Sequence, residues 1–342
     1  MPHDLHIASG AAFLPLVSDP DVARMALEGL LAPRKTLQPS LFYDEEGCRL
    51  FYAITKLPEY YLTRTEFRLL ETVAPEVAGL FHPGFSPPGF SPPGLFPIGA
   101  TLVEYGASDE TKAAMLLRQT AAGGETVFRS YVPIDVAAPA LRALRERMRA
   151  RHPAIAVSPV TADFMRPVTL PARDAESAVL GFFPGSTIGN LEPDAAIGFL
   201  RRARLTLGMG ARFLLGFDMC RDPARLIPAY DDAQGVTAAF NLNLLTRLNR
   251  EAGADFDLAA FRHEARWNAA GSRIEMHLVS RAAQTVAVAG ETVRFARDES
   301  IHTENSHKYA PERMRAMIEA AGWSRQRAWS DPEGLFALWL LG

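Results

Sequence analysis

Several residues whose side chains suit ligand binding stand at the ends of short apolar segments. Gly106 lets a ligand approach the backbone closely. The Asp135 carboxylate can accept hydrogen bonds from both hydroxyls of a ribose. Asp163 can accept one from an adenine amino group, with the ring of Phe164 packed nearby. Each acid alone is more often a solvated loop residue. Because such residues follow one apolar segment after another, however, together they favour a nucleoside without phosphates as the ligand.

The phosphates of a dinucleotide have no evident binding loop, because Gly106 is not part of a Gly-x-Gly-x-x-Gly motif. S-Adenosylmethionine is a nucleoside that carries no phosphate, and Lys112 could reach its methionine carboxylate. The alternative for Lys112 is an ordinary exposed lysine on a helix. The residues therefore favour S-adenosylmethionine as the cofactor, and they imply no metal ion.

Apolar segments alternate with helical segments between residues 100 and 217, which predicts a parallel sheet with helices on both faces. The predicted strands are Thr101–Tyr105, Ser130–Val136, Ala154–Val160, Ser177–Phe183 and Arg212–Phe217. The predicted helices between them are Thr111–Gln119, Pro139–Ala150 and Asp194–Leu205. The ligand-binding residues then lie at the carboxyl ends of strands, where open α/β sheets bind their ligands.

The chain has a different pattern on either side of this region. Before it, helices are predicted over Pro20–Leu31 and Cys48–Lys56, and Thr63 or Thr65 could cap a third. After residue 220, a long helical stretch precedes alternating apolar and polar segments, which indicates a separate α+β lobe. The segments are Ala233–Glu251, Arg273–Ser280 and Gln284–Ala289.

Composition and charge exclude several classes of protein. The length of 342 residues suits two domains, or one large domain with an elaborated lobe, and a composition that is 48% hydrophobic can bury a sizeable core. With 36 basic and 39 acidic side chains, the formal net charge is −3, so there is no electrostatic footprint for nucleic acid. Cys48 and Cys220 match no metal or redox spacing. Without a signal-peptide pattern or an apolar run of ~20 residues, we expect a cytoplasmic protein with no membrane partner.

Residues 84–93 are two tandem copies of Gly-Phe-Ser-Pro-Pro. Proline lacks an N–H and has a fixed φ, so this segment can be neither a helix nor a central strand. It is either a duplicated surface loop or, less often, a proline-rich ligand for a partner domain. No obligate protein partner is evident elsewhere in the sequence.

Five longer motifs occur in order between residues 57 and 309. They are Leu57–Tyr61, Pro184–Pro193, Tyr230–Asn241, Arg273–Leu278 and Thr303–Tyr309. Together they resemble the signatures of the histidine-specific Nα-methyltransferases of ergothioneine biosynthesis. The glycine loop differs, because this chain has Gly106-Ala107-Ser108 where relatives often have Gly-x-Gly.

The resemblance implies a fold and an activity. The expected fold is a Rossmann-like class I methyltransferase domain with a second α+β substrate lobe. The expected boundaries are residues 66–220 for the first and residues 12–65 plus 221–342 for the second. The expected reaction is three methyl transfers from S-adenosylmethionine to the α-amino group of histidine, which give hercynine.

The resemblance also implies the residues of an amino-acid pocket. Asn190 and Tyr230 would hold the substrate carboxylate and orient the amine, since an amide offers both a donor and an acceptor. Tyr60 would pack against the imidazole and help place the amine, with Tyr43 close by. Asn190 and Tyr60 are therefore the expected catalytic residues, and Gly185 is expected on the cofactor side. Without the resemblance, Asn190 is equally well interpreted as a helix cap and the tyrosines as core aromatics.

The side chain of the substrate would be recognised by a second group of residues. Glu304 and Ser306 would bind the two imidazole nitrogens, and Met276 would line the same pocket. An unpaired polar group in such a pocket is costly, which makes this pair the expected source of specificity. The alternatives are a solvated polar loop for the pair and plain core for Met276. His302 and His307 flank the motif and are expected to be surface or packing residues.

Three other functions remain open from the sequence. The first is a paralogue that methylates another free amino acid, such as tryptophan or a histidine derivative; the second is a nicotinamide-dependent oxidoreductase. The third is a binding module without catalytic activity. Glu304 and Ser306 argue against an indole pocket, and the missing phosphate-binding loop argues against a nicotinamide cofactor.

Overall fold

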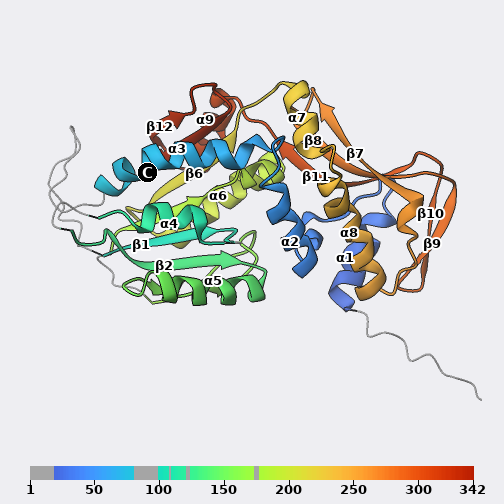
Figure 1. The fold of residues 1–342 in the computed structure, drawn as a ribbon, viewed down its shortest axis with the longest axis horizontal. Helices are drawn as coiled ribbons and strands as arrows, with labels where there is room; N and C mark the ends of the chain where they lie inside the picture. The colour runs from blue at the N-terminus through green and yellow to red at the C-terminus, as the bar shows by residue number, and fades with distance from the viewer. Residues whose placement is uncertain (1–18, 81–98, 108, 121–123, 173–176) are drawn as a thin grey trace, which may run out of the picture.

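The computed structural model describes residues 19–80, 99–107, 109–120, 124–172 and 177–342. These residues form two lobes that lie side by side (Figure 1). One contains the large sheet with its covering helices, and the other contains α1, α8 and the hairpins of β7 to β11. The Gly-Phe-Ser-Pro-Pro copies and Ser108 lie outside the described residues.

The large sheet has eight strands, in the order β12-β13-β6-β5-β1-β2-β3, with β4 also paired to β2. The strands that run parallel are β1 (Ala100–Tyr105), β2 (Phe128–Asp135), β3 (Ala156–Val157), β4 (Val160–Thr161), β5 (Val179–Phe183) and β6 (Arg212–Asp218). From β1 the chain builds the sheet first toward β3 and then, from β5, in the other direction. The carboxyl edge between β1 and its neighbours is thus a switch point, where such sheets bind ligands.

The prediction of a single continuous third strand was wrong. The segment Ala154–Val160 forms two short strands, β3 and β4, that pair with β2 on either side of a gap. Pro159 lies in that gap, and it has no N–H to continue the ladder of hydrogen bonds. The other predicted strands of this sheet were confirmed with small shifts at their ends.

Helices cover both faces of the sheet. Neighbouring residues of β1 point to opposite faces of the sheet, as in any strand. Leu102 packs against the helices on one face, and Val103 packs against the helices on the other face. The first set is α3 (Tyr61–Gly79), α4 (Thr111–Leu117) and α5 (Ala138–Arg151). The second set is α6 (Pro193–Leu207) and α9 (Pro311–Ala320).

Helix α3 begins earlier than the sequence indicated. Its first residue is Tyr61, so Thr63 and Thr65 lie inside the helix and neither of them caps it. Tyr61 and Leu62 are both buried in the core of the second lobe. Burial of these two side chains therefore outweighs the threonine capping preference that the sequence suggested.

The second lobe combines helices with a three-stranded antiparallel sheet in the order β11-β8-β7. Its helices are α1 (Pro20–Leu30), η1 (Pro39–Phe42), α2 (Glu45–Ile54), α7 (Pro223–Tyr230), α8 (Val236–Glu251) and η3 (Leu258–Ala260). Its strands are β7 (Phe261–Asn268), β8 (Arg273–Ser280), β11 (Ser300–His307) and the separate hairpin β9 (Gln284–Val288) with β10 (Glu291–Phe295). Helix α8 starts after residue 233 because the Asp232 carboxylate accepts hydrogen bonds from the N–H groups of Val236 and Thr237.

The C-terminal strands do not belong to this lobe. The sequence placed all of 221–342 there, but β13 (Phe336–Leu341) pairs antiparallel with β6, and β12 (Arg325–Ser330) pairs with β13. The chain therefore returns to the large sheet after β11. The two lobes are joined by several crossings of the chain, and the segment after β11 lies beside the end of β6.

The centre of the large sheet has no space for an added methyl group. A Cβ at Gly181 in β5 would lie 2.4 Å from Cδ2 of Phe213 and 2.6 Å from Cδ1 of Leu207. Gly181→Ala should therefore lower stability by about 1–3 kcal/mol, the usual cost of overpacking. Gly79→Ala is the matched control, because nothing lies within 4 Å of the added atom. Denaturant unfolding measures both, and equal stability of the two variants would contradict this packing.

Candidate active site

The carboxyl edge of the large sheet gathers the residues predicted to bind a nucleoside. Gly106 follows β1 with φ +74°, and a Cβ there would meet only the Phe164 ring, at 3.8 Å. Asp135 ends β2, and its Oδ1 accepts a hydrogen bond of 2.8 Å from the N–H of Ala137. Burial raises the pKa of this carboxyl. The loop after β1 is thus open to a ligand, with a carboxylate beside it.

Phe164 forms an aromatic wall at this edge. Its ring makes edge-on contacts with Tyr105, Phe183 and Phe199, at centroid distances of 6.5, 5.5 and 5.4 Å. Asp163 is exposed, and its Oδ1 accepts a hydrogen bond of 2.8 Å from the N–H of Met165. The arrangement offers an apolar face for a planar ring with an acidic group at its rim.

Lys112 is mostly buried and ion-paired, so its interpretation as an ordinary exposed lysine was wrong. Its Nζ lies 2.5 Å from Oε2 of Glu66, a fully buried residue of α3. The same carboxylate accepts hydrogen bonds from the N–H of Gly185, at 2.8 and 3.0 Å. Glu66 therefore holds Lys112 and Gly185 together. It follows no strand and belongs to no recognised motif, so the sequence analysis did not find it.

A second polar cluster lies where β11 meets the 3₁₀ turn η2 (Thr187–Asn190). Asn190 Nδ2 donates a hydrogen bond of 3.0 Å to Oε1 of Glu304, and Met276 is the cross-strand partner of Glu304 on β8. Glu304 and Met276 are both buried. Burial raises the pKa of Glu304 to about 8, although Lys308 opposes the shift. The Asn190 side chain does not cap α6, so that alternative was wrong.

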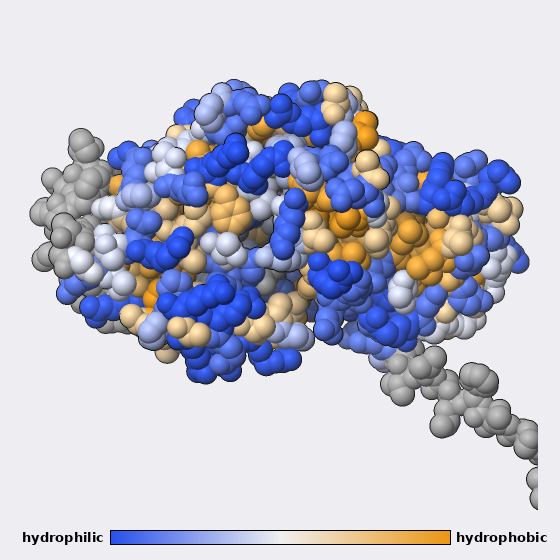
Figure 2. Space-filling view, in the orientation of Figure 1, coloured by the Kyte–Doolittle hydropathy of each residue, from blue (hydrophilic) through white to orange (hydrophobic). Residues whose placement is uncertain are grey.

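Three tyrosines and a serine complete this cluster. The rings of Tyr60 and Tyr230 meet edge-on at 6.0 Å, and the Tyr230 hydroxyl lies 2.8 Å from Oγ of Ser306. Burial raises the pKa of Tyr43, with a further contribution from the charge of Glu304. The structure thus gathers all of the residues predicted for the amino-acid pocket at the junction of the lobes. In the space-filling view the surface is hollowed near its middle, where the lobes meet (Figure 2).

A buried ion pair lies beneath the cluster and was not foreseen. Lys308 Nζ lies 2.7 Å from Oδ2 of Asp218, and both side chains have no exposed surface. Lys308 also donates to the hydroxyl oxygens of Tyr230 and Ser306, at 2.9 Å each. Lys308 stood inside a quoted motif and Asp218 just past a predicted strand. The two residues are 90 positions apart in the chain, so no local sequence pattern indicates that they pair.

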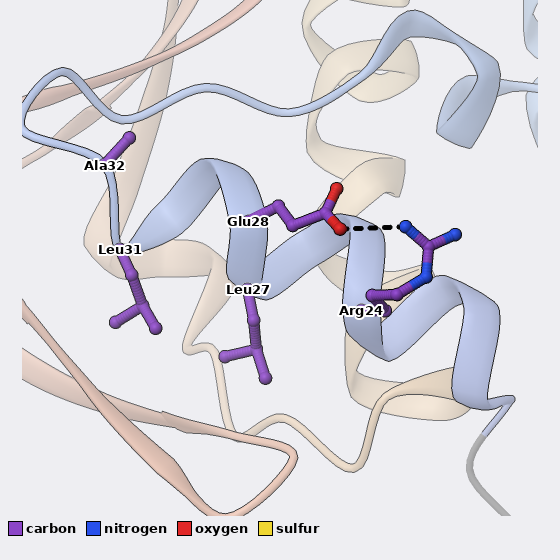
Figure 3. A pocket seen from close by; sticks show the side chains of 5 residues that line it. All are labelled: Arg24, Leu27, Glu28, Leu31 and Ala32. Carbon is purple, nitrogen blue, oxygen red and sulfur yellow. Dashed lines mark hydrogen bonds and ion pairs between the residues drawn. The ribbon is translucent and has the colours of Figure 1, made fainter.

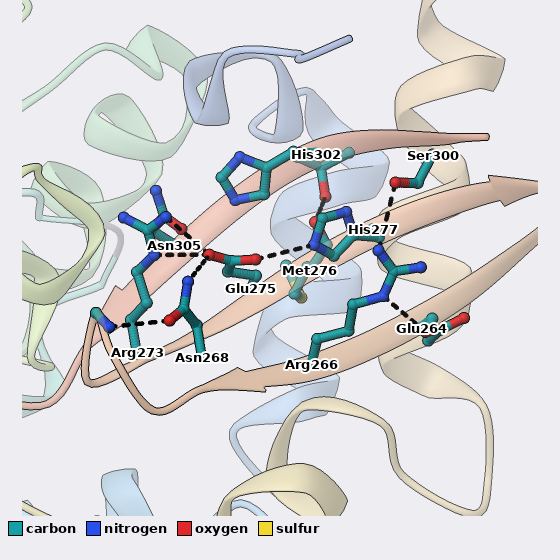
Figure 4. Close-up of polar contacts among 12 residues, drawn as sticks. Glu264, Arg266, Asn268, Arg273, Glu275, Met276, His277, Ser300, His302 and Asn305 are labelled. Carbon is teal, nitrogen blue, oxygen red and sulfur yellow. Dashed lines mark hydrogen bonds and ion pairs between the residues drawn. The ribbon is translucent and has the colours of Figure 1, made fainter. Parts of the chain in front are cut away.

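The two histidines near the motif lie outside the cluster. His307 is buried, with its ring stacked on that of Tyr309 at 5.8 Å, and His302 lies against His277 at 5.1 Å. Figure 4 shows His277, His302 and Glu275 in a polar network across β8 and β11. Since neighbouring residues of a strand point to opposite faces, this network lies opposite to buried Met276.

A shallow surface pocket on α1 is unrelated to either group of residues. It is lined by Arg24, Leu27, Glu28, Leu31 and Ala32, with Arg24 hydrogen-bonded to Glu28 (Figure 3). Within the described residues, no group of three or more His, Cys, Asp or Glu side chains could hold a metal ion. No helix in the same part of the chain is long and apolar enough to cross a membrane.

The order of the large sheet and the match to a family model define a class I methyltransferase that depends on S-adenosylmethionine. Residues 22–342 match the family described as histidine-specific, S-adenosylmethionine-dependent methyltransferases, and the chain belongs to this family. The alternative prediction of a nicotinamide-dependent oxidoreductase was therefore wrong.

Curated relatives align over nearly the whole chain. The histidine N-alpha-methyltransferase of Mycolicibacterium smegmatis is 42% identical over 91% of this chain and 91% of its own length. The histidine N-alpha-methyltransferase of Mycobacterium tuberculosis is 39% identical over 97% of this chain and 96% of its own length. The ergothioneine biosynthesis protein 1 of Neurospora crassa is 28% identical over 91% of this chain and 35% of its own.

A buried carboxyl in β1 makes stability depend on pH. Glu104 accepts a hydrogen bond from the Tyr131 hydroxyl, and burial raises its pKa from 4.5 to about 8. The folded protein thus binds this proton more tightly than the unfolded chain does. Its stabilising contribution is full below about pH 4.5 and is lost as the pH rises through about 8. Glu104→Gln should therefore reduce the fall in melting temperature between pH 5 and pH 9.

The control for this prediction is Glu45→Gln, which changes an exposed carboxyl at the start of α2. Melting curves of the wild type and both variants across this range are the measurement. The Glu45 variant should follow the wild type. A Glu104 variant with the same pH dependence as the wild type would show that this carboxyl does not hold a proton in the folded state.

Proposed function

We propose that this protein transfers methyl groups from S-adenosylmethionine to the α-amino group of L-histidine, three times in succession, and releases hercynine. The observation that carries the proposal is the buried Glu304, which is hydrogen-bonded to Asn190 and lies two residues along β11 from Ser306, itself bonded to the Tyr230 hydroxyl. A carboxylate and a hydroxyl on one strand suit the two nitrogens of an imidazole. The names of the two mycobacterial relatives support the same substrate.

The cofactor site is the carboxyl edge of the large sheet. Gly106 leaves room at the loop after β1, and Asp135, which ends β2, would accept hydrogen bonds from the two ribose hydroxyls. The ring of Phe164 would pack near the adenine, and the exposed Asp163 would accept a hydrogen bond from its amino group. Lys112 keeps donors beyond its bond to Glu66 for the methionine carboxylate, and Gly185 brings the backbone beside it.

The protein itself has a modest chemical task. When bound, S-adenosylmethionine supplies a methyl group that is already activated, so the chain has to hold a neutral amine in line with it. Asn190 and Tyr60 orient the amine, and the ammonium formed by each transfer releases its proton to solvent before the next. The rings of Tyr60 and Tyr230 offer faces to the final quaternary ammonium, which has no proton left to donate.

The test is incubation of the purified protein with S-adenosylmethionine and each amino acid in turn, followed by mass spectrometry. Histidine should give mono-, di- and trimethylated products, and added hercynine should gain no further methyl group. Methylation of tryptophan or of a histidine derivative in place of histidine would favour the paralogue. Absence of any product with a bound cofactor would favour a binding module.

Asp135 provides a prediction for the cofactor site. Asp135→Ala removes an acceptor for two hydroxyls and should weaken binding of S-adenosylhomocysteine by about 1.5–3 kcal/mol for each charged hydrogen bond lost. Asp21→Ala, which changes an exposed carboxylate of α1, is the control. Calorimetric titration is the measurement, and equal affinity for both variants would overturn the role given to Asp135.

Glu304 provides a prediction for the substrate site. Glu304→Ala leaves an imidazole N–H unpaired in a buried site and should lower kcat/KM for histidine by about 10-fold to 100-fold. Phenylalanine and tryptophan should gain relative to histidine, and a smaller residue at Met276 should widen that change. Glu304→Gln keeps the volume and one acceptor, so its loss should be smaller. Unchanged histidine turnover in Glu304→Ala would remove this residue from substrate recognition.

A further inference from the structure

The Glu66 carboxylate is the point at which three parts of the large-sheet lobe meet. Glu66 belongs to α3, and its side chain has no exposed surface. Both of its oxygens accept from the N–H of Gly185, at 2.8 and 3.0 Å, and Lys112 Nζ of α4 lies 2.5 Å from Oε2. A buried carboxylate is costly unless it is paired and hydrogen-bonded, and this one is both. One side chain therefore joins α3, α4 and the loop after β5.

Two glycines leave room for this arrangement. A Cβ at Gly216 in β6 would lie 2.6 Å from Oε1 of Glu66, so a side chain there would displace the carboxylate. A Cβ at Gly185 would lie 3.3 Å from Lys112 Nζ, and the φ of +76° at this position also favours glycine. The carboxylate therefore packs against the backbone of β6, and the ammonium packs against the loop after β5.

The ion pair lies beside the end of β1 and is open to solvent at its lysine. The charges of Lys112 and Glu66 both act on the pKa of Glu104, two residues before Gly106; Lys112 lowers this pKa and Glu66 raises it. Glu66 is fully buried, whereas Lys112 keeps 19% of its side-chain surface exposed. The pair therefore presents its ammonium, and not its carboxylate, to the carboxyl edge of the sheet.

We propose that Glu66 is a positioning residue that holds the Lys112 ammonium beside Gly185 and thereby gives the cofactor site its preference for a nucleoside with an α-amino-acid end. A lysine ammonium sits on a flexible stem of four carbons, so ordering it on a ligand costs entropy. Glu66 orders it before the cofactor binds, which lowers that cost. Because Glu66 is fully buried, it acts through Lys112. The proposal rests on the cofactor site of the proposed function.

A purely structural role for Glu66 makes a different prediction. If the carboxylate only tied the loop after β5 to α3, its loss would weaken binding of any nucleoside at this edge. If it positions Lys112, its loss weakens only those ligands that have a carboxylate for this lysine. Glu66→Gln separates the two roles, since an amide oxygen can still accept from the N–H of Gly185 although the negative charge is gone.

The experiment is calorimetric titration with two ligands that share a nucleoside. S-Adenosylhomocysteine has the amino-acid end, and methylthioadenosine lacks it. The wild type should bind the first more tightly, and Glu66→Gln should reduce this preference by about 10-fold, as loss of a charged contact does. Affinity for methylthioadenosine should not change. Glu110→Gln is the matched control, because Glu110 is a buried carboxylate at the start of α4 that is paired with Arg147 at 2.7 Å. It should keep the preference.

Lys112→Met shows whether Glu66 acts through the lysine. This variant should lose the preference by itself, and adding Glu66→Gln to it should cause no further loss. A second loss of the same size, an equal change for both ligands in Glu66→Gln, or a wild type without the preference would overturn the proposal. The same holds if Glu110→Gln loses the preference as Glu66→Gln does. Tighter binding of S-adenosylhomocysteine by Glu66→Gln would also overturn it, because Glu66 would then compete with the cofactor for Lys112.

Melting curves check that each variant is folded. If Glu66→Gln does not fold, a crystal structure of the wild type with S-adenosylhomocysteine replaces it. Lys112 should then contact Glu66 and the cofactor carboxylate at once, and a Lys112 that has left Glu66 would overturn the proposal. Failure of the proposed function is separate, because the titrations contain no histidine. A protein that binds both ligands as expected but methylates no histidine would contradict the proposed function alone.

Discussion

The ion pair of Lys308 and Asp218 is the interaction on which the junction of the two lobes depends. Two fully buried charges cost several kcal/mol each to remove from water, and the cost is offset only when both are paired and hydrogen-bonded. That condition is met here, because Lys308 uses all three of its donors and Asp218 also accepts from Tyr61 and from the N–H of Cys220. Loss of either partner would leave a lone charge between the lobes. The pair therefore constrains where β6, α3, α7 and β11 meet, and with them the polar cluster.

Glu304 differs from this ion pair in the number of hydrogen bonds that it receives from the protein. It is buried, its protein hydrogen-bond donor in the described structure is Asn190, and burial keeps its pKa near 8. A carboxyl held in this way gains most from a ligand that brings its own N–H. In the proposed function the substrate ring supplies that donor, so substrate binding and the ionisation of Glu304 support each other. In the proposed function the ion pair thus fixes the geometry of the site, whereas the Glu304 carboxyl, bonded to Asn190, selects the substrate.

Much of the fold could be predicted from local patterns. The strand Arg273–Ser280 was predicted with the observed bounds, because polar and apolar residues alternate from Arg273 to Leu278. The pattern failed where one residue overrode it, as Pro159 did in dividing the third strand. It also failed where pairing is distant, since nothing near Phe336–Leu341 indicates that this strand joins β6. In the site, the residues predicted for the amino-acid pocket, apart from Tyr43, belonged to the five motifs, whereas Glu66 and Asp218 act by holding other side chains. Glu66 and Gly185 are 119 residues apart, so only the folded chain brings them together.

A crystal structure of the protein with S-adenosylhomocysteine and L-histidine is the measurement that tests the account most directly. The account predicts an imidazole between Glu304 and Ser306, with the Tyr230 hydroxyl still bonded to Ser306 and Lys308. The α-amine should lie near Asn190 and Tyr60 and should point at the sulfur. A histidine bound outside this cluster, or one whose carboxylate takes the place given to the ring, would contradict it.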